Sequence, residues 1–285
     1  GAVEDGIADF SNLNSKTDTD YYITCETAQS YLFTIGNSLI QRCSVTNALA
    51  FMNETRADTF KWGNAGVGWR DSHQFSFELP SLALQYMANP ALFDNLPYSI
   101  VSVDTCEYSE LRIQDEPDII WLMQFAAMRY YDWGANDGKK LHMLIKEQLA
   151  WFLYIYPEIK DYVDNTFGED FYETLRTFTI QQWSESTSNM GWYTVGNTNH
   201  DLFSVQTEFG SLKGNQPPGH SILPNLLMYE VAMRDGLDSE LAQRFFDAAY
   251  DNALYTIELD IANPRWSKGQ RMSEHVNVEG LSWYL

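Results

Sequence analysis

A glycine-rich stretch, Gly63–Gln74, is the part of the sequence best suited to chemistry. Its three glycines allow positive φ angles and a close approach of other groups. We interpret it as an active-site loop, because a flat indole ring among hydrogen-bond donors and acceptors suits the binding of a sugar. The alternative interpretation is a connecting loop in which Asp71 merely caps the next helix. The residues of this loop that can act on a substrate are Trp69, Arg70, Asp71, His73 and Gln74.

Asp71 is the candidate catalytic base. Inverting hydrolysis of a glycosidic bond needs two carboxyl groups about 6.5–9.5 Å apart, one to activate water and one to protonate the leaving oxygen. Glu274 is the candidate acid, because it lies in a second polar loop where burial would raise its pKa. Glu116, with Asp115 beside it, is the rival acid, although the start of a helix explains this pair more simply.

The second polar loop, Asn263–His275, is expected to face the first across a cleft. In a protein built of helical hairpins, every second connection lies on the same side. We therefore expect Trp69 and Trp266 to line one cleft with Asp71. Arg271 would keep one of the carboxylates ionised, since a cation within about 4–6 Å favours the charged form; alternatively, it simply pairs with Glu274.

Histidines fall mainly in loops and show no metal-binding spacing. Neither HxH nor HxxxH occurs, so we expect no metal and no cofactor. His200, between Asn199 and Asp201, is a candidate substrate-binding residue, and it could abstract a proton as in a polysaccharide lyase. The loop histidines are His73, His200, His220 and His275.

The composition favours a neutral partner over an anionic one. The 285 residues include 18 basic and 39 acidic side chains, for a formal net charge of −21, which repels nucleic acids and anionic membranes. Aromatic residues make up 15% of the chain, and aromatic rings stack on the apolar faces of sugars. We therefore expect a polysaccharide or oligosaccharide as the partner, and no nucleic acid.

Cysteine use and hydropathy indicate neither a disulfide framework nor a membrane span. Three cysteines cannot all pair, and none has zinc-site spacing. No apolar run approaches the ~18 residues needed to cross a bilayer, so no membrane insertion is expected. The first residue is glycine rather than methionine. From these features we expect a secreted, periplasmic or cell-surface protein whose signal peptide has been removed.

Helical periodicity recurs along most of the chain. Residues 1–22 are polar and aperiodic, and they are expected to form a linker or a flexible tail. Residues 23–285 are expected to form an all-α (α/α)6-type helical-hairpin toroid of about nine helices, incomplete at its C-terminus. Helices are predicted at Thr27–Arg42, Phe75–Tyr86, Pro117–Gly134, Leu141–Tyr156 with a stop at Pro157, Phe171–Trp183, Ile222–Arg234, Ser239–Leu259 and Val276–Leu285.

Three motifs in order resemble the opening of family-9 glycoside hydrolases, the endoglucanase-like (α/α)6 toroids. They are Leu39–Cys43 at the end of a first helix, Gly66–Phe75 opening a second, and Asp115–Glu116 before an apolar helix. The resemblance covers roughly Ala28–Tyr131 and implies a six-hairpin fold and hydrolysis of a glycan.

The family's catalytic pattern is only partly present. Its glycine loop carries Asp-Ala-Gly-Asp, in which the first Asp helps to hold water and the second is regarded as the base. These positions fall on Asp71 and Gln74, and glutamine cannot accept the proton. Ser273-Glu274-His275 resembles the setting of the family's acid. The sequence thus predicts a glycoside hydrolase, with two alternatives: a non-catalytic glycan-binding protein on a degenerate glycosidase fold, or a polysaccharide lyase.

Overall fold

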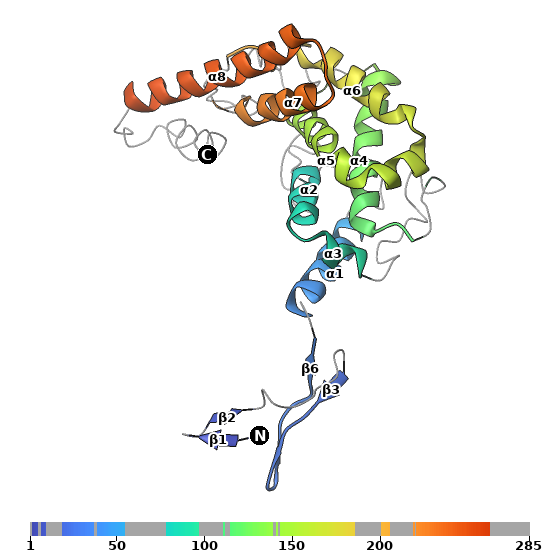
Figure 1. The fold of residues 1–285 in the computed structure, drawn as a ribbon, viewed down its shortest axis with the longest axis vertical. Coiled ribbons are helices and arrows are strands. Elements are labelled where there is room, and N and C mark those ends of the chain that lie inside the picture. The colour runs from blue at the N-terminus through green and yellow to red at the C-terminus, as the bar shows by residue number, and fades with distance from the viewer. Residues whose placement is uncertain are drawn as a thin grey trace. The chain divides into compact units, whose positions relative to one another are not determined.

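The computed structural model describes a predominantly helical chain, as predicted. In the described residues there are eight α-helices and six short strands (Figure 1). The chain divides into two compact units, Gly1–Ala48 and Leu49–Leu285. The described residues are 2–4, 7–9, 19–36, 39–54, 78–96, 111, 115–138, 141, 143–185, 201–205, 219 and 221–262.

The first unit contains antiparallel strand pairs. Strands β3 (Thr19–Tyr21) and β6 (Phe33–Ile35) pair, and β4 (Thr24–Cys25) pairs with β5 (Ala28–Gln29). Strands β1 (Ala2–Glu4) and β2 (Ile7–Asp9) form a separate pair.

The helix predicted over Thr27–Arg42 is therefore wrong for most of its length. Helix α1 begins only at Leu39 and ends at Glu54. Tyr, Phe, Thr and Ile crowd residues 31–35, and these residues favour strands over helices. A turn at Glu26, whose φ is 51°, brings the two strands of this hairpin together, which the apolar spacing did not reveal.

Seven helices follow in the second unit, and most were predicted. The predictions for α2, α4, α6, α7 and α8 are confirmed to within a few residues. Helix α7 has the predicted bounds, and a short turn joins it to α8. The helices are α2 (Glu78–Ala88), α3 (Pro90–Asp94), α4 (Asp118–Ala135), α5 (Met143–Phe167), α6 (Asp170–Trp183), α7 (Ile222–Arg234) and α8 (Ser239–Ala262).

Helix α5 is the centre of this unit. It packs against α2, α4, α6 and α7, while α2 also packs on α4 and α7 on α8 (Figure 1). Helix α5 thus lies between α2 and α7, and the hairpins α5–α6 and α7–α8 lie side by side. Burial on several sides explains why α5 is apolar over much of its circumference; its fully buried side chains include Leu149, Phe152, Leu153, Ile159 and Val163.

Pro157 was predicted to end the fourth helix, and this prediction is wrong. Helix α5 continues through Pro157 to Phe167. Proline has no N–H, so the carbonyl of Leu153, four residues earlier, loses its usual helical donor. The guanidinium of Arg234 replaces that donor: Nη2 donates to the Leu153 oxygen at 3.0 Å and Nη1 to the Tyr154 oxygen at 3.0 Å. The helix continues because another helix satisfies its backbone.

The turn between α7 and α8 holds Arg234 in place. Asp235 accepts a hydrogen bond from Arg234 Nε at 2.8 Å and one from Arg176 Nη1 at 2.6 Å. Tyr172 also donates to Asp235 and accepts from Arg234. Burial raises the pKa of Asp235, but the hydrogen bonds from Arg234, Tyr172 and Arg176 outweigh it and hold that pKa below its usual value. The turn therefore joins α5, α6 and α7 through one carboxylate.

Replacing Arg234 with methionine should destabilise the protein by about 1–3 kcal/mol, because the Leu153 carbonyl would lose its donor. Pro157→Ala restores a main-chain N–H for that carbonyl. In the Pro157→Ala background, Arg234→Met should therefore cost measurably less. Urea unfolding followed by circular dichroism, arranged as a double-mutant cycle, measures this coupling. Equal costs in both backgrounds would show that Arg234 does not compensate for the proline.

Candidate functional site

A buried polar cluster lies where α6 ends and where α5 and α7 begin. We call Lys146, Trp183, Leu202 and Asn225 the Trp183 cluster; all four are fully buried. Lys146 Nζ donates to the main-chain oxygens of Trp183 at 3.3 Å and Glu185 at 2.8 Å. The last carbonyls of a helix have no helical partner and carry partial negative charge, so they suit a buried ammonium group. Lys146 thus fixes the beginning of α5 to the end of α6.

Asn225 joins three segments through one side chain. Its Oδ1 accepts a hydrogen bond from Trp183 Nε1 at 2.9 Å. Its Nδ2 donates to the Leu202 oxygen and to the Ser221 oxygen, each at 2.7 Å. The Leu202 N–H in turn donates to the Trp183 oxygen at 3.0 Å. Residues around Leu202 are therefore tied to the end of α6 and the beginning of α7.

The segment Asp201–Val205 has further fixed contacts. The Asp201 carboxylate accepts from the Phe203 N–H at 2.9 Å and from the Ser204 hydroxyl at 3.0 Å. Phe203 lies under the guanidinium of Arg244, 3.8 Å from the ring centre. Asn252 Nδ2 of α8 donates to the Ser204 oxygen at 3.2 Å. Helices α6, α7 and α8 thus together position the residues that directly follow His200 in the sequence.

Glu147, in the second turn of α5, is a buried carboxyl group. Burial raises its pKa well above the ordinary value, and the nearby Trp151 side chain opposes that shift only partly. A raised pKa is what a general acid needs. Glu147 is only 3% exposed, however, and it lies among core side chains. We interpret it as a neutral core residue rather than a group that reaches a substrate.

Glu116 proves to be more than an acidic residue at a helix start. Helix α4 begins at Asp118 behind Pro117, so the predicted start is confirmed. Asp115 is exposed with a φ of 71°, whereas Glu116 is 1% exposed and accepts from Gln124 Nε2 at 2.6 Å. The carboxylate of Glu116 therefore holds the start of α4 against its second turn.

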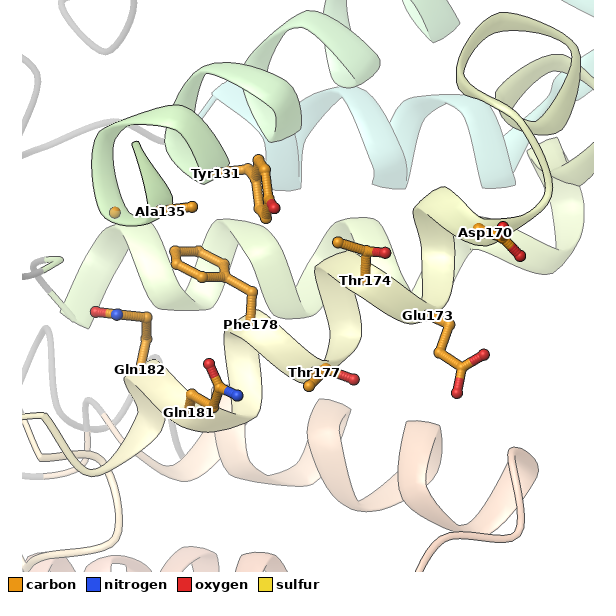
Figure 2. A pocket seen from close by; sticks show the side chains of 10 residues that line it. Tyr131, Ala135, Asp170, Glu173, Thr174, Thr177, Phe178, Gln181 and Gln182 are labelled. Atoms are coloured by element: carbon orange, nitrogen blue, oxygen red, sulfur yellow. The ribbon is translucent and has the colours of Figure 1, made fainter. Parts of the chain in front are cut away.

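A shallow, open pocket of about 720 Å³ lies between the end of α4 and one face of α6 (Figure 2). Tyr131 of α4 and Phe178 of α6 meet edge to face, with ring centres 5.0 Å apart. Gly134 makes this contact possible, because a Cβ at that position would lie 2.3 Å from Phe178 Cζ. The lining residues are Tyr131, Gly134, Ala135, Asp170, Glu173, Thr174, Thr177, Phe178, Gln181 and Gln182.

The site residues predicted from the sequence lie outside the described residues. They are Trp69, Arg70, Asp71, His73, Gln74, His200, Trp266, Arg271 and Glu274. The structure instead describes the ends of the helices that these segments join. Within the described ranges, no group of three or more His, Cys, Asp or Glu side chains could hold a metal ion. No helix in the same part of the chain is long and apolar enough to cross a membrane.

Searches against protein-family models, curated proteins and solved structures found no match to the chain. The resemblance to family-9 glycoside hydrolases therefore rests on the three motifs alone and stays a prediction.

Asn225→Ala should loosen the segment Asp201–Val205. The Leu202 and Ser221 oxygens and the Trp183 indole would lose their buried partner, at a cost of about 2–4 kcal/mol. We expect amide hydrogen exchange at Leu202 to accelerate at least tenfold, as measured by exchange with NMR detection. Thr179→Val is the control, because Thr179 is buried on α6 but donates only within its own helix, to the Leu175 oxygen. Equal acceleration in both variants would contradict a specific role for Asn225.

Glu147→Gln should stabilise the protein increasingly as the pH rises. The folded-state pKa of Glu147 is raised above its ordinary value of 4.5. The stability that the folded protein gains from holding this proton is therefore fully present below pH 4.5 and is lost as the pH rises toward the folded-state pKa. The wild type should lose about 1.4 kcal/mol per pH unit in that window relative to the variant. Urea unfolding between pH 4.5 and 7 measures the difference, with the exposed Glu240→Gln as the control for removing one carboxyl group. A difference that does not change with pH would contradict a buried, protonated Glu147.

Proposed function

We propose that the protein is a carbohydrate-active enzyme, a glycoside hydrolase that cleaves a polysaccharide or oligosaccharide by inverting acid/base catalysis. The proposed architecture is an (α/α)6-type toroid. The packing of the helices supports it: α5 packs against both α2 and α7, and α2, α5 and α7 pack in turn against α4, α6 and α8. In a toroid of this type, the first helix of each hairpin belongs to an inner ring and the second helix to an outer ring.

The directions of the helices are the observation that carries the proposal. Helix α5 begins and α6 ends at Lys146 and Trp183, and α7 begins there at Asn225. Helix α8 returns toward the same end after its short turn, because Asn252 reaches Ser204. The long connection between α6 and α7 thus leaves α6 and enters α7 at the end marked by the Trp183 cluster, and α8 runs toward that same end.

Helix α2 runs in the same direction as α5. Burial and then the charge of Asp94 raise the pKa of Tyr86, in the last turn of α2, and Tyr162 and Glu158, in the second half of α5, lie close enough to add to that shift. The beginning of α2, which the glycine loop Gly63–Gln74 precedes, therefore faces the end where α5 begins. This common end supports a shared site for Asp71, His200 and the loop Asn263–His275.

In the proposed site, Asp71 activates water and Glu274 protonates the leaving oxygen. Trp69 and Trp266 provide faces for sugar rings, and Arg70, His73, Gln74, His200 and Arg271 provide hydrogen bonds to the substrate. No cofactor takes part. Lys146 and Asn225 contribute indirectly, because they hold the helix ends from which these residues extend.

Gln74 favours a second candidate, a glycan-binding protein without turnover. The resemblance puts the family's base at this position, and a carboxamide cannot take a proton from water. In this candidate the same residues bind the glycan but do not hydrolyse it.

Reducing-sugar release from a panel of glucans, xylans and host glycans tests the proposed function. We expect release by the wild type and a loss of at least 100-fold in kcat for Asp71→Asn, because general base catalysis contributes about 10²–10⁴-fold. An Asp71→Asn variant with full activity would contradict the assignment. Glycan binding without release, together with a gain of hydrolysis in Gln74→Asp, would establish the second candidate. Unsaturated products absorbing in the ultraviolet would identify a lyase instead.

A further inference from the structure

The hairpin of α7 and α8 has an apolar face that no described residue covers. On α8, Phe246, Tyr250 and Leu254 follow one another at intervals of four residues, so they lie on one side of the helix, and they are 41%, 58% and 42% exposed. The rings of Phe246 and Tyr229 lie with their centres 5.5 Å apart and join this row to α7, where further apolar side chains are exposed. We call the six residues of both rows the α7–α8 face: Leu226, Tyr229, Met233, Phe246, Tyr250 and Leu254.

An exposed apolar face of this kind marks an interaction surface. A helix side that met only water would carry polar residues, and contiguous apolar patches with polar rims are typical of binding sites. Among the described helices, α8 packs mainly against α7 (Figure 1). The apolar side of α8 that points away from α7 therefore has room for another element.

The rim of the α7–α8 face is acidic. Glu230 lies between Leu226 and Met233 in the row on α7, and Glu258 continues the row on α8. Asp247 and Asp251 are exposed beside the same row. An element that covers the face should therefore combine apolar side chains with few acidic ones.

A second copy of the chain fits this rim poorly. The formal net charge of each chain is −21. A twofold interface places the same patch of both chains together, so the carboxylates of the rim would meet one another. Like charges at such short distances oppose association.

The residues that follow α8 have the composition that the face requires. They lie outside the described residues. In the sequence, residues 263–285 contain three basic and two acidic side chains, whereas the whole chain contains 18 basic and 39 acidic ones. The segment Val276–Leu285 is predicted to be a helix, and Val278, Leu281 and Leu285 recur in it at the spacing of one helical side.

The connection to this segment is long enough for it to fold back. Thirteen residues, 263–275, separate the end of α8 from Val276. Leu254 and Phe246 lie about 12 Å and 24 Å before the last residue of α8, at 1.5 Å per residue. Thirteen extended residues span up to about 40 Å. A tethered segment also needs little affinity, because the tether gives it an effective concentration in the millimolar range.

We propose that the α7–α8 face is the docking surface for Val276–Leu285 of the same chain. The apolar side of this segment covers Phe246, Tyr250 and Leu254, and its neutral composition avoids the repulsion of the rim. Docking fixes the loop Asn263–His275 at both of its ends. In the proposed enzyme, this loop carries Glu274, so the consequence for catalysis rests on the proposed function, whereas the docking itself does not.

Hydroxyl-radical footprinting with detection by mass spectrometry tests the docking on the intact wild-type chain. It measures the accessibility of single side chains. Tyr31, which is 96% exposed, is the reference for Tyr250, because both are tyrosines. We expect Tyr250 to be oxidised at least tenfold more slowly than Tyr31. A smaller difference would show that the face is open and would overturn the proposal.

A pair of variants identifies the segment that covers the face. Leu281→Gln should raise the oxidation of Phe246 and Tyr250 at least threefold. Glu279→Gln is the matched control, since helical spacing puts Glu279 on the opposite side of the predicted helix from Leu281 and the new side chain is the same. Oxidation that does not change in Leu281→Gln, or that rises equally in both variants, would overturn the proposal.

Two further measurements separate the alternatives. Protection of Tyr250 that disappears on dilution, together with a dimer in analytical ultracentrifugation, would show that a second copy covers the face and would overturn the proposal. Reducing-sugar release distinguishes failure of the docking from failure of the proposed function. Release by a wild type with an accessible Tyr250 removes only the docking, whereas a protected Tyr250 without release leaves the docking standing and removes the hydrolase.

Discussion

Helix α5 carries two polar groups that its own backbone cannot satisfy, the ammonium of Lys146 and the carbonyl of Leu153 opposite Pro157. The end of α6 accepts the first, and Arg234 at the end of α7 donates to the second. A buried polar group without a partner costs enough to disfavour any other packing of these helices. The relative positions of α5, α6 and α7 are therefore specified by hydrogen bonds as well as by the apolar core around Leu149 and Phe152.

These two contacts lie at different positions along α5, and they hold different connections between the helices in place. The contact at Leu153 involves the short turn between α7 and α8, where Asp235 also binds Arg176 and Tyr172. The contact at Lys146 lies where a long connection leaves α6, and Asn225 and Trp183 hold the residues around Leu202 there. In the proposed enzyme, one end of the helices is thus closed by short turns, while the other presents the segments that carry the site.

Much of the helical framework was predictable from local patterns. The periodicity of Ile222–Arg234 and the turn after it identified α7 and the start of α8, because these signals depend only on neighbouring residues. The continuation through Pro157 was not predictable, since Arg234 lies far along the chain from Leu153. The strands before α1 were missed for a related reason: pairing across a turn decides them, and the helical spacing of a few apolar residues suggested the opposite.

The candidate site was predicted from residue types alone, and the Trp183 cluster was not recognised. Lys146 and Glu147 stand beside each other in a helix that looks half polar at its start, which usually indicates an exposed turn. Their burial follows from the packing of α6 and α7 over α5, which no local pattern encodes. The sequence likewise identifies Glu116 only as a residue at the start of a helix. Its hydrogen bond with Gln124 is known only from the structure.

The central claim is that this helical framework supports an inverting glycosidase, and the stereochemistry of its product tests that claim most directly. Proton NMR of a β-linked oligosaccharide during the first minutes of reaction reports the anomer released before mutarotation. Two carboxyl groups separated by a water molecule give the α-anomer as the first product. Release of the β-anomer, or of an unsaturated sugar, would contradict the account.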